Sequence, residues 1–341
     1  MVARSGPGWQ GQDRQGPDWK HELRQVFTRP EALRAFLGLP AADQCGDAAS
    51  TAQGFRMLVP RGYAALMEAG NPDDPLLRQV LPLPVEDEVR PGFSVDPVGD
   101  SRAALAPGLL QKYRGRALLV STPACAIHCR YCFRRHFPYE HGALSADGGA
   151  AAVASIAADP TITEVILSGG DPLMLDDEPL AALIEALSAI PHLERLRIHT
   201  RLPVVLPARI TTALCQVLEP TRLHVVVVIH ANHPRELGDA AGEALDRLRG
   251  VGAVLLNQSV LLRGVNDTPD TLCDLSERLF RFSVVPYYLH LLDRVQGAAH
   301  FEVQEAEARH LMSALRVRLP GYLVPRLVRE EVGTATKIPI A

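Results

Sequence analysis

Beyond residue 115 the sequence alternates short apolar runs with longer segments of helical periodicity, and this alternation is the feature that most constrains the fold. It is typical of βα units, in which parallel strands form a sheet that helices cover. The apolar runs predict strands at Ala117–Ser121, Glu164–Leu167, Arg195–His199, Leu223–Ile229, Ala253–Asn257 and Val284–Leu289. After the second strand, apolar residues recur with the period of a helix at Leu180, Leu183, Ile184, Leu187 and Ile190. Six strands of this kind predict an α/β fold, a partial (β/α)6 TIM-like barrel.

The first 110 residues lack this regular pattern. Residues 1–20 are rich in Gly, Gln, Asp and Pro, and such a composition favours a disordered tail. Residues 21–110 are expected to form a helical extension with a linker, and the barrel is placed at residues 111–341. Within the extension, the sequence predicts one or two short helices over His21–Leu37, a helix over Leu76–Leu81, and an irregular linker from about Arg90 to Leu110.

Composition narrows the class of partner. A formal charge of −4 and a pI near 6.3 provide no basic surface for a nucleic acid, so a small-molecule substrate is favoured. No run approaches the roughly 18 apolar residues that span a bilayer, and residues 1–20 lack the apolar core of a signal peptide. We therefore expect a cytoplasmic protein without a membrane partner, in a compartment where thiols stay reduced.

Polar residues follow every predicted strand at its C-terminal end. They are a loop with three cysteines after the first strand, Ser168-Gly169-Gly170-Asp171-Pro172, Thr200-Arg201, His230 with Asn232 and His233, Gln258 with Ser259, and His290 with Asp293. Parallel strands bring these ends together at one mouth of a barrel, so we expect one site there.

Cys125, Cys129 and Cys132 have the spacing C-x3-C-x2-C. Three thiolates can hold three irons of a four-iron cluster and leave the fourth iron open, whereas structural clusters usually have four cysteine ligands. The spacing therefore predicts a cluster whose open iron binds a small molecule.

Two alternatives for these cysteines remain open. One is a Cys3His zinc site completed by His128 or His136, and the other is a set of buried structural cysteines. The remaining cysteines, Cys45, Cys215 and Cys273, fit no ligand spacing and are expected in the core.

The cysteine spacing resembles the signature of radical S-adenosylmethionine (SAM) enzymes, and further runs resemble the lysine 2,3-aminomutases of that superfamily. These runs are 129–139 (CRYCFRRHFPY), 167–173 (LSGGDPL), 201–210 (RLPVVLPARI), 257–267 (NQSVLLRGVND) and 286–290 (PYYLH). Three more, 71–80, 295–301 and 321–325, resemble the short branch that makes β-lysine for modification of translation elongation factor P. The resemblance covers roughly residues 60–341 and implies a partial barrel of the radical SAM type with an N-terminal helical extension.

The resemblance also implies cofactors. Radical SAM enzymes hold a 4Fe-4S cluster on the three cysteines and SAM on its open iron, and the aminomutases use pyridoxal 5′-phosphate (PLP) as well. The residues that match SAM contacts and the motif beside them are Ser168, Gly169, Gly170, Asp171, His230 and Gln258. Lys337, within the small-residue stretch Gly333–Lys337, matches the catalytic lysine that holds PLP, and Tyr113 and Arg116 match residues around it.

The same matching places the substrate. Arg134 matches the residue that binds the substrate carboxylate, for which a guanidinium fork is well suited. Asp293 matches an acid that pairs with the distal ammonium of lysine, and Glu330 stands where a second acid is expected. The implied reaction converts L-α-lysine to (R)-β-lysine.

The implied partners are a reductant such as flavodoxin or ferredoxin and a ligase that attaches the product to elongation factor P. The alternatives are a catabolic lysine 2,3-aminomutase, an aminomutase of another amino acid, and an iron–sulfur protein with a structural or electron-transfer role. No zinc is expected, because Thr268 stands where the larger catabolic enzymes have a cysteine.

Overall fold

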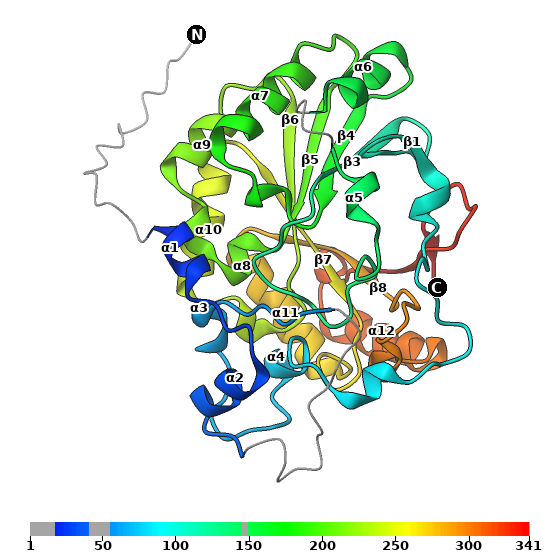
Figure 1. Ribbon diagram of the computed structural model, residues 1–341. Coiled ribbons are helices and arrows are strands. Elements are labelled where there is room, and N and C mark those ends of the chain that lie inside the picture. Colours follow the sequence, from blue (N-terminus) through cyan, green and yellow to red (C-terminus); the bar gives the residue numbers. More distant parts are fainter. Residues whose placement is uncertain (1–17, 41–54, 145–148, 341) are drawn as a thin grey trace.

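A ten-stranded sheet forms the centre of the computed structural model, which describes residues 18–40, 55–144 and 149–340 (Figure 1). Each strand pairs with its neighbours in chain order, and all pairs from β3 to β9 are parallel. Antiparallel pairs add β1 and β2 at one edge and β10 at the other. The strands are β1 (Ala104–Ala106), β2 (Leu109–Leu110), β3 (Arg116–Thr122), β4 (Glu164–Gly169), β5 (Arg195–Thr200), β6 (His224–Ile229), β7 (Val254–Val260), β8 (Val285–His290), β9 (Arg326–Arg329) and β10 (Ile338–Pro339). This open, curved sheet is the partial barrel that the sequence predicts.

The six predicted strands are confirmed as β3 to β8, with ends that differ by up to three residues. The seventh parallel strand, β9, was not predicted, because only Leu327 and Val328 are buried in it and an arginine stands on either side. The region from Arg90 to Leu110 is wrongly described as an irregular linker, since β1 and β2 lie in it. Buried Leu109 pairs with Leu119 of β3 and so extends the sheet.

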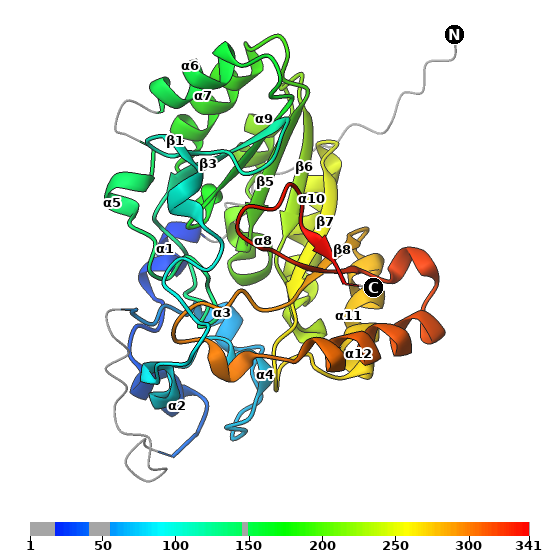
Figure 2. The same ribbon diagram turned by 90° about the vertical axis from the view of Figure 1, so that its right-hand side faces the viewer.

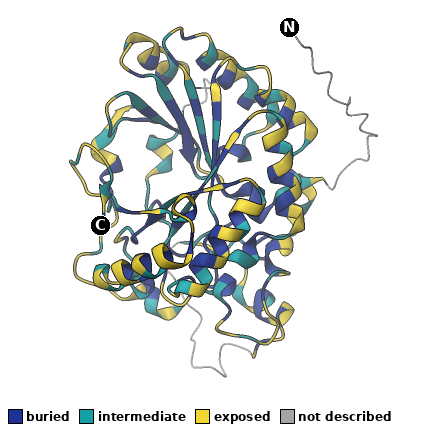
Figure 3. Cartoon of the chain, turned by 180° about the vertical axis from the view of Figure 1, so that it is seen from behind, coloured by how far each residue is buried: buried dark blue, intermediate teal, exposed yellow. Residues whose placement is uncertain are grey.

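Helices cover the outside of the sheet. The helices after β3 are α5 (Tyr139–Gly142), α6 (Ala150–Ala158), α7 (Asp177–Ser188), α8 (Leu202–Val205), α9 (Thr212–Leu218), α10 (Asp239–Gly250), α11 (Pro269–Arg281) and α12 (Glu305–Arg318). In α7 the predicted apolar face is buried, and Ile190, just beyond the helix end, is buried too. Figure 3 shows the consequence: the central strands are mostly buried or half-buried, and the outward faces of the helices are exposed.

The N-terminal extension is helical, as predicted, and consists of α1 (Trp19–Arg24), α2 (Pro30–Phe36), α3 (Arg61–Ala64) and α4 (Pro75–Arg78). Two boundaries need correction. The predicted tail ends before residue 20, because the Asp18 side chain accepts a hydrogen bond from the Lys20 backbone and caps α1. The helix expected over Leu76–Leu81 is a single turn. Residues 1–17 and Cys45 lie outside the described residues.

A buried ion-pair cluster joins this extension to the loop that follows β3. Glu86, on the short 3-10 helix Pro84–Asp87, accepts from Arg130 at 2.5 Å and from Arg135 at 2.9 Å. Arg130 is fully buried and also donates to the backbone carbonyl of Phe55. Because Arg130 and Arg135 belong to the cysteine-containing segment, the extension holds that segment against the barrel.

The C-terminal segment returns to the barrel beside β8 (Figure 2). Its strand β9 pairs with β8, and β10 pairs with β9 with Ile338 opposite Arg329. Cys215 and Cys273 are buried, as expected of core residues. In the described ranges no helix is both long enough and apolar enough to cross a membrane.

Candidate active site

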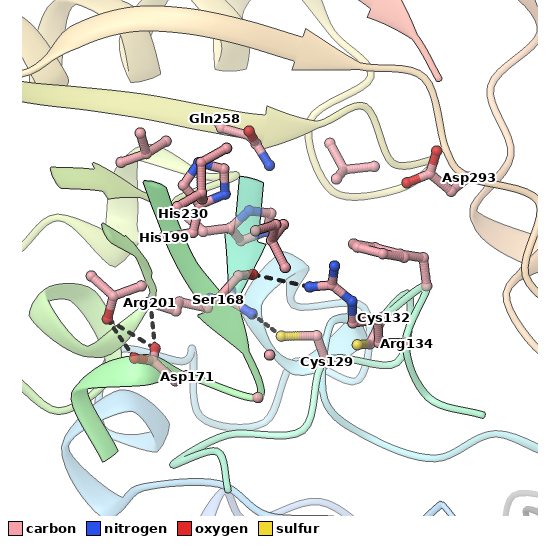
Figure 4. Close-up of a pocket in the computed structure, with 18 of the residues that line it drawn as sticks. Cys129, Cys132, Arg134, Ser168, Asp171, His199, Arg201, His230, Gln258 and Asp293 are labelled. Carbon is pink, nitrogen blue, oxygen red and sulfur yellow. Dashed lines mark hydrogen bonds between the residues drawn. The ribbon is translucent and has the colours of Figure 1, made fainter. Parts of the chain in front are cut away.

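A cavity of about 600 Å³ opens at the C-terminal ends of the parallel strands. Every residue to which the sequence analysis assigns a ligand or a catalytic role lines it, and Figure 4 shows several of them converging from different strands. These residues are Tyr113, Arg116, Cys125, Cys129, Cys132, Arg134, Ser168, Gly169, Gly170, Asp171, His230, Gln258, Asp293, Glu330 and Lys337. The fold thus brings the predicted residues to one place, while their roles remain predictions.

The pair Gly169-Gly170 fixes the start of the cysteine loop. A Cβ on Gly170 would lie 2.3 Å from the carbonyl oxygen of Ala124, and one on Gly169 would lie 2.7 Å from that of Thr122. The Gly170 backbone N–H donates to the Thr122 carbonyl at 2.7 Å. Only residues without side chains let the end of β4 approach this loop so closely. The glycines therefore have a packing role next to the ligand-binding role that the sequence predicts.

The three cysteines lie on this loop at one end of the cavity. Burial raises the pKa of Cys132 to about 11 and that of Cys125 well above its usual range, so a metal ion has to replace the thiol protons. The described residues include no group of His, Cys, Asp and Glu side chains gathered closely enough for a single metal ion. Three cysteines that lie on one loop and line one cavity fit the ligands of a cluster.

The histidines of the alternative zinc site have other partners. His128 Nδ1 lies 2.7 Å from the Arg56 carbonyl, and His136 Nε2 lies 3.3 Å from the Gln296 carbonyl. Each ring is thus held by the backbone of a distant segment, and neither joins the cysteines in a tetrahedral group.

Asp171 ties the ends of β4 and β5 together. Its carboxylate accepts from the Thr200 hydroxyl and from the Arg201 backbone N–H, each at 2.7 Å, and from the Leu173 backbone. Burial raises its pKa to about 6 despite these bonds. The Asp171 side chain therefore fixes the ends of β4 and β5 relative to each other at the mouth of the barrel.

His230 and Gln258 face the cavity from neighbouring strands. His230 stacks on Tyr131, and its Nε2 lies 2.8 Å from the Tyr131 hydroxyl. Burial and the nearby charge of Arg201 lower the pKa of His230 to about 3, so the ring is a neutral imidazole. At Gln258 the register between β7 and β8 shifts, and such an irregularity re-aims a side chain.

Cationic and anionic side chains alternate along another wall of the cavity and form a series of ion pairs, which we call the charge chain. Lys337 Nζ lies 2.5 Å from Glu330 Oε2, and Lys112 Nζ lies 3.1 Å from Glu330 Oε1. Lys112 also contacts Asp100 Oδ1 at 2.6 Å, and Asp100 Oδ2 accepts from Arg134 Nε at 2.7 Å. Although burial opposes it, the two lysines lower the pKa of Glu330 to about 2. Both lysines that line the cavity, Lys112 and Lys337, therefore belong to this series of ion pairs.

The hairpin of β9 and β10 explains how this wall forms. Glu330 directly follows β9 and Lys337 directly precedes β10, so the pairing of the two strands brings the residues together. Asp100 and Lys112 were not assigned roles in the sequence analysis. Asp100 belongs to the supposed linker and Lys112 to the first residues of the predicted barrel, and the place of both beside the cavity depends on the pairing of β2 with β3. The rarity of lysine was the one sequence feature that could have drawn attention to Lys112, because the chain has only three lysines.

Among the residues that the structure describes, Asp293 and Arg116 form no ion pair, in contrast to their neighbours Glu330 and Lys112. Burial and the charge of Glu330 raise the pKa of Asp293 to about 7. The Arg116 guanidinium stacks over the Tyr113 ring at 5.2 Å, and no carboxylate of the described residues lies within ion-pair distance of it. Two further cavity groups, His199 Nε2 and His290 Nε2, are buried and have no hydrogen-bond partner in the described part of the chain. An unpaired cation and unsatisfied imidazoles fit a polar, anionic ligand such as a phosphate-bearing cofactor.

Three residues expected at the mouth do not line the cavity. Asn232 donates to Tyr131 and Gln79, the His233 ring accepts from the Arg235 backbone, and Ser259 donates to the Ala231 carbonyl. Their polar groups are used to satisfy buried backbone and side-chain partners beneath the site.

Comparison with known proteins places the chain in a family. The model of the Radical SAM superfamily matches residues 119–275. The chain is 48% identical over 323 residues to an L-lysine 2,3-aminomutase of Escherichia coli (strain K12), an alignment that covers 95% of this chain and 94% of that protein. For an L-lysine 2,3-aminomutase of Haemophilus influenzae the identity is 45% over 324 residues, with 95% and 96% covered. An L-lysine 2,3-aminomutase of Clostridium subterminale is 34% identical over 325 residues, with 95% and 77% covered. Identity at this level over almost the whole chain shows that it belongs to the L-lysine 2,3-aminomutase family, isomerases of the radical SAM superfamily.

Proposed function

We propose that the protein converts L-lysine to (R)-β-lysine in the cytoplasm and that the product serves to modify elongation factor P. The observation that carries the proposal is the position of Lys337, which lines the same cavity as the three cysteines. An iron–sulfur protein with only a structural or electron-transfer role has no use for an amine at that place. The higher identity to the relatives from E. coli and H. influenzae than to the clostridial one supports the short branch.

Three bound groups fit the cavity. Cys125, Cys129 and Cys132 would hold the 4Fe-4S cluster, and the strand ends with His230 and Gln258 would hold SAM. A flavodoxin or ferredoxin would supply the electron. Together the cluster and SAM supply a carbon radical that abstracts hydrogen, and PLP supplies a delocalised π system that stabilises the migrating nitrogen.

The wall with the charge chain would hold PLP and the substrate. Lys337 is the amine that would bind PLP, and Arg116, which lacks a carboxylate partner among the described residues, suits its phosphate. Arg134 is held by Asp100 and by the Ser168 hydroxyl at 2.9 Å, so one edge of its guanidinium remains for a carboxylate.

The distal ammonium of lysine would lie between Asp293 and Glu330. In the structure Glu330 has two ammonium partners, Lys112 and Lys337. Once Lys337 is used by PLP it no longer neutralises Glu330, and the substrate ammonium can take its place. Two carboxylates around one ammonium select lysine over neutral amino acids, because a buried charge without a partner costs several kcal/mol.

The test traps PLP on the protein. We expect borohydride reduction of the PLP-loaded enzyme, followed by peptide mapping, to label Lys337. Lys337→Ala should lose the label and keep the iron, because different residues hold the two groups, whereas the matched variant Lys112→Ala should keep the label. A label on Lys112, or on neither lysine, would overturn the assignment.

Activity and role need a second experiment. The anaerobically reconstituted enzyme, given L-lysine, SAM and a reductant, should release (R)-β-lysine, identified by chiral chromatography. A ligase acting on elongation factor P should then transfer that product to its target protein. Release of another isomer, or a product that the ligase rejects, would contradict the branch assignment.

A further inference from the structure

Arg201 is a buried cation that the proposed function leaves unused. It follows β5 and is 6% exposed. One guanidinium nitrogen, Nη1, lies 2.7 Å from the Sγ of Cys129, a contact drawn in Figure 4. Cys129 is the middle cysteine of the loop, so this guanidinium points at a sulfur atom that would bind iron.

The other end of the guanidinium is fixed. Nη2 donates to Gln79 Oε1 at 2.7 Å and to Glu236 Oε2 at 2.9 Å, and both acceptors are fully buried. Glu236 also accepts from Gln79 Nε2 and from the backbone of Asn232. Turning this guanidinium away from the sulfur would take its cation from the buried Glu236 carboxylate, which it contacts at 2.9 Å.

The anchor is also connected to the cysteine loop itself. The Gln79 carbonyl accepts the backbone N–H of Arg130, the residue directly after Cys129, at 2.8 Å. Gln79 belongs to the N-terminal extension, and Glu236 lies on the 3-10 helix Pro234–Glu236 after β6. Extension, loop and barrel therefore meet at this one guanidinium.

From this geometry we infer that Arg201 is a positioning residue which donates a charge-assisted hydrogen bond to the Cys129 thiolate of the 4Fe-4S cluster and raises the reduction potential of the cluster. Hydrogen bonds to the sulfur ligands and nearby charge are known determinants of cluster potentials. The bond draws electron density away from the sulfur, and the reduced cluster carries one more negative charge than the oxidised one. The reduced form is therefore stabilised more. The inference rests on a cluster at the three cysteines and needs neither lysine nor PLP.

The test is a redox titration of the anaerobically reconstituted full-length protein, followed by the electron paramagnetic resonance signal of the reduced cluster. In Arg201→Met we expect about a tenfold lower ratio of reduced to oxidised cluster at the same applied potential, which for one electron is a shift of about 59 mV to more negative values. Arg201→Lys should lie between this variant and the unaltered protein, because it keeps the charge but not the directed fork.

Arg209→Met is the matched control. Arg209 is as deeply buried, but it binds the carbonyls of Leu173 and Leu175, away from the cysteines. It should lose thermal stability without a change in potential. If Arg201→Met does not retain iron, the reduction potentials of Arg201→Lys and Arg201→Gln are compared with that of the unaltered protein instead.

An unchanged potential in Arg201 variants with full iron content would overturn the inference, and so would a potential of Arg201→Lys equal to that of the unaltered protein. Failure of lysine turnover would leave this measurement intact. The titration therefore fails or succeeds independently of the proposed substrate.

Discussion

At the scale of single residues, Asp293 has the most testable chemistry. Burial and Glu330 raise the pKa of this carboxyl to about 7, so it is neutral below that pH and charged above it. If it binds the substrate ammonium, kcat/KM for lysine should rise as the pH increases through about 7, because that ratio reports the free enzyme. Asp293→Asn should lower kcat/KM and flatten this part of the profile.

Norleucine provides the control for this prediction, since its side chain carries no charge and should show no such rise. The stability of the ligand-free protein changes in the opposite direction. The folded state keeps the Asp293 proton to a higher pH than the unfolded chain, so stability falls between about pH 4 and 7 and Asp293→Asn removes that fall. If kcat/KM for lysine has the same pH profile in Asp293→Asn as in the unaltered protein, another group binds the ammonium.

The sequence predicted the place of a site residue, though not its role, where that residue lies next to a strand end. The cysteines, Ser168 and His230 all follow apolar runs, and the parallel sheet collects such positions at one mouth. Asp100 and Arg201 were not assigned roles. Their partners, Arg134 and Cys129, are distant in the chain, and no local pattern reports such pairs.

At the scale of elements, the contact between the end of β4 and the cysteine loop is the tightest point of the site. Gly170→Ala would place a methyl group 2.3 Å from the Ala124 carbonyl oxygen and 2.7 Å from that of Pro123. Both are backbone atoms, so the loop has to move. We expect a loss of roughly 1–3 kcal/mol in unfolding free energy and a clear loss of iron per chain after reconstitution.

The matched control is Gly250→Ala at the end of α10, where a new Cβ would meet nothing within 4 Å. It should leave iron content unchanged. Full iron in Gly170→Ala would show that the loop tolerates displacement and that the glycine pair is not needed for packing.

The elements also show where sequence patterns stop being informative. Strands β3 to β8 were predictable because each contains buried apolar residues, in a continuous run in β4 and β6 and in alternation in β5. In contrast, β2 has two residues and β9 has four, and neither would form without the neighbour that it extends. Their existence depends on tertiary pairing, which a local pattern does not encode.

At the scale of the whole molecule, Glu86 connects the N-terminal extension to the barrel. It is the anion for two buried guanidinium groups, those of Arg130 and Arg135. Glu86→Ala leaves both cations without compensation, and breaking a buried pair in this way costs about 3–5 kcal/mol. We expect a lower midpoint in urea unfolding and a cluster that is lost more readily, because Arg130 lies between Cys129 and Cys132 and Arg135 follows them closely.

Glu88→Ala is the comparison for that variant. Glu88 pairs with Arg90 at the surface, where both side chains are about half exposed, so its removal should cost less than about 1 kcal/mol. Equal midpoints for the two variants would indicate that the extension is attached to the barrel by other contacts.

The distribution of lysines has a practical consequence. The chain has only Lys20, Lys112 and Lys337, and the last two both stand on the cavity wall beside Glu330. Reagents that target primary amines should therefore react first at Lys20, whose side chain is 49% exposed, and only in excess at Lys112 and Lys337, which are 20% and 22% exposed and ion-paired. Sparse labelling should preserve the protein, whereas exhaustive amine coupling should reach the cavity and inactivate it.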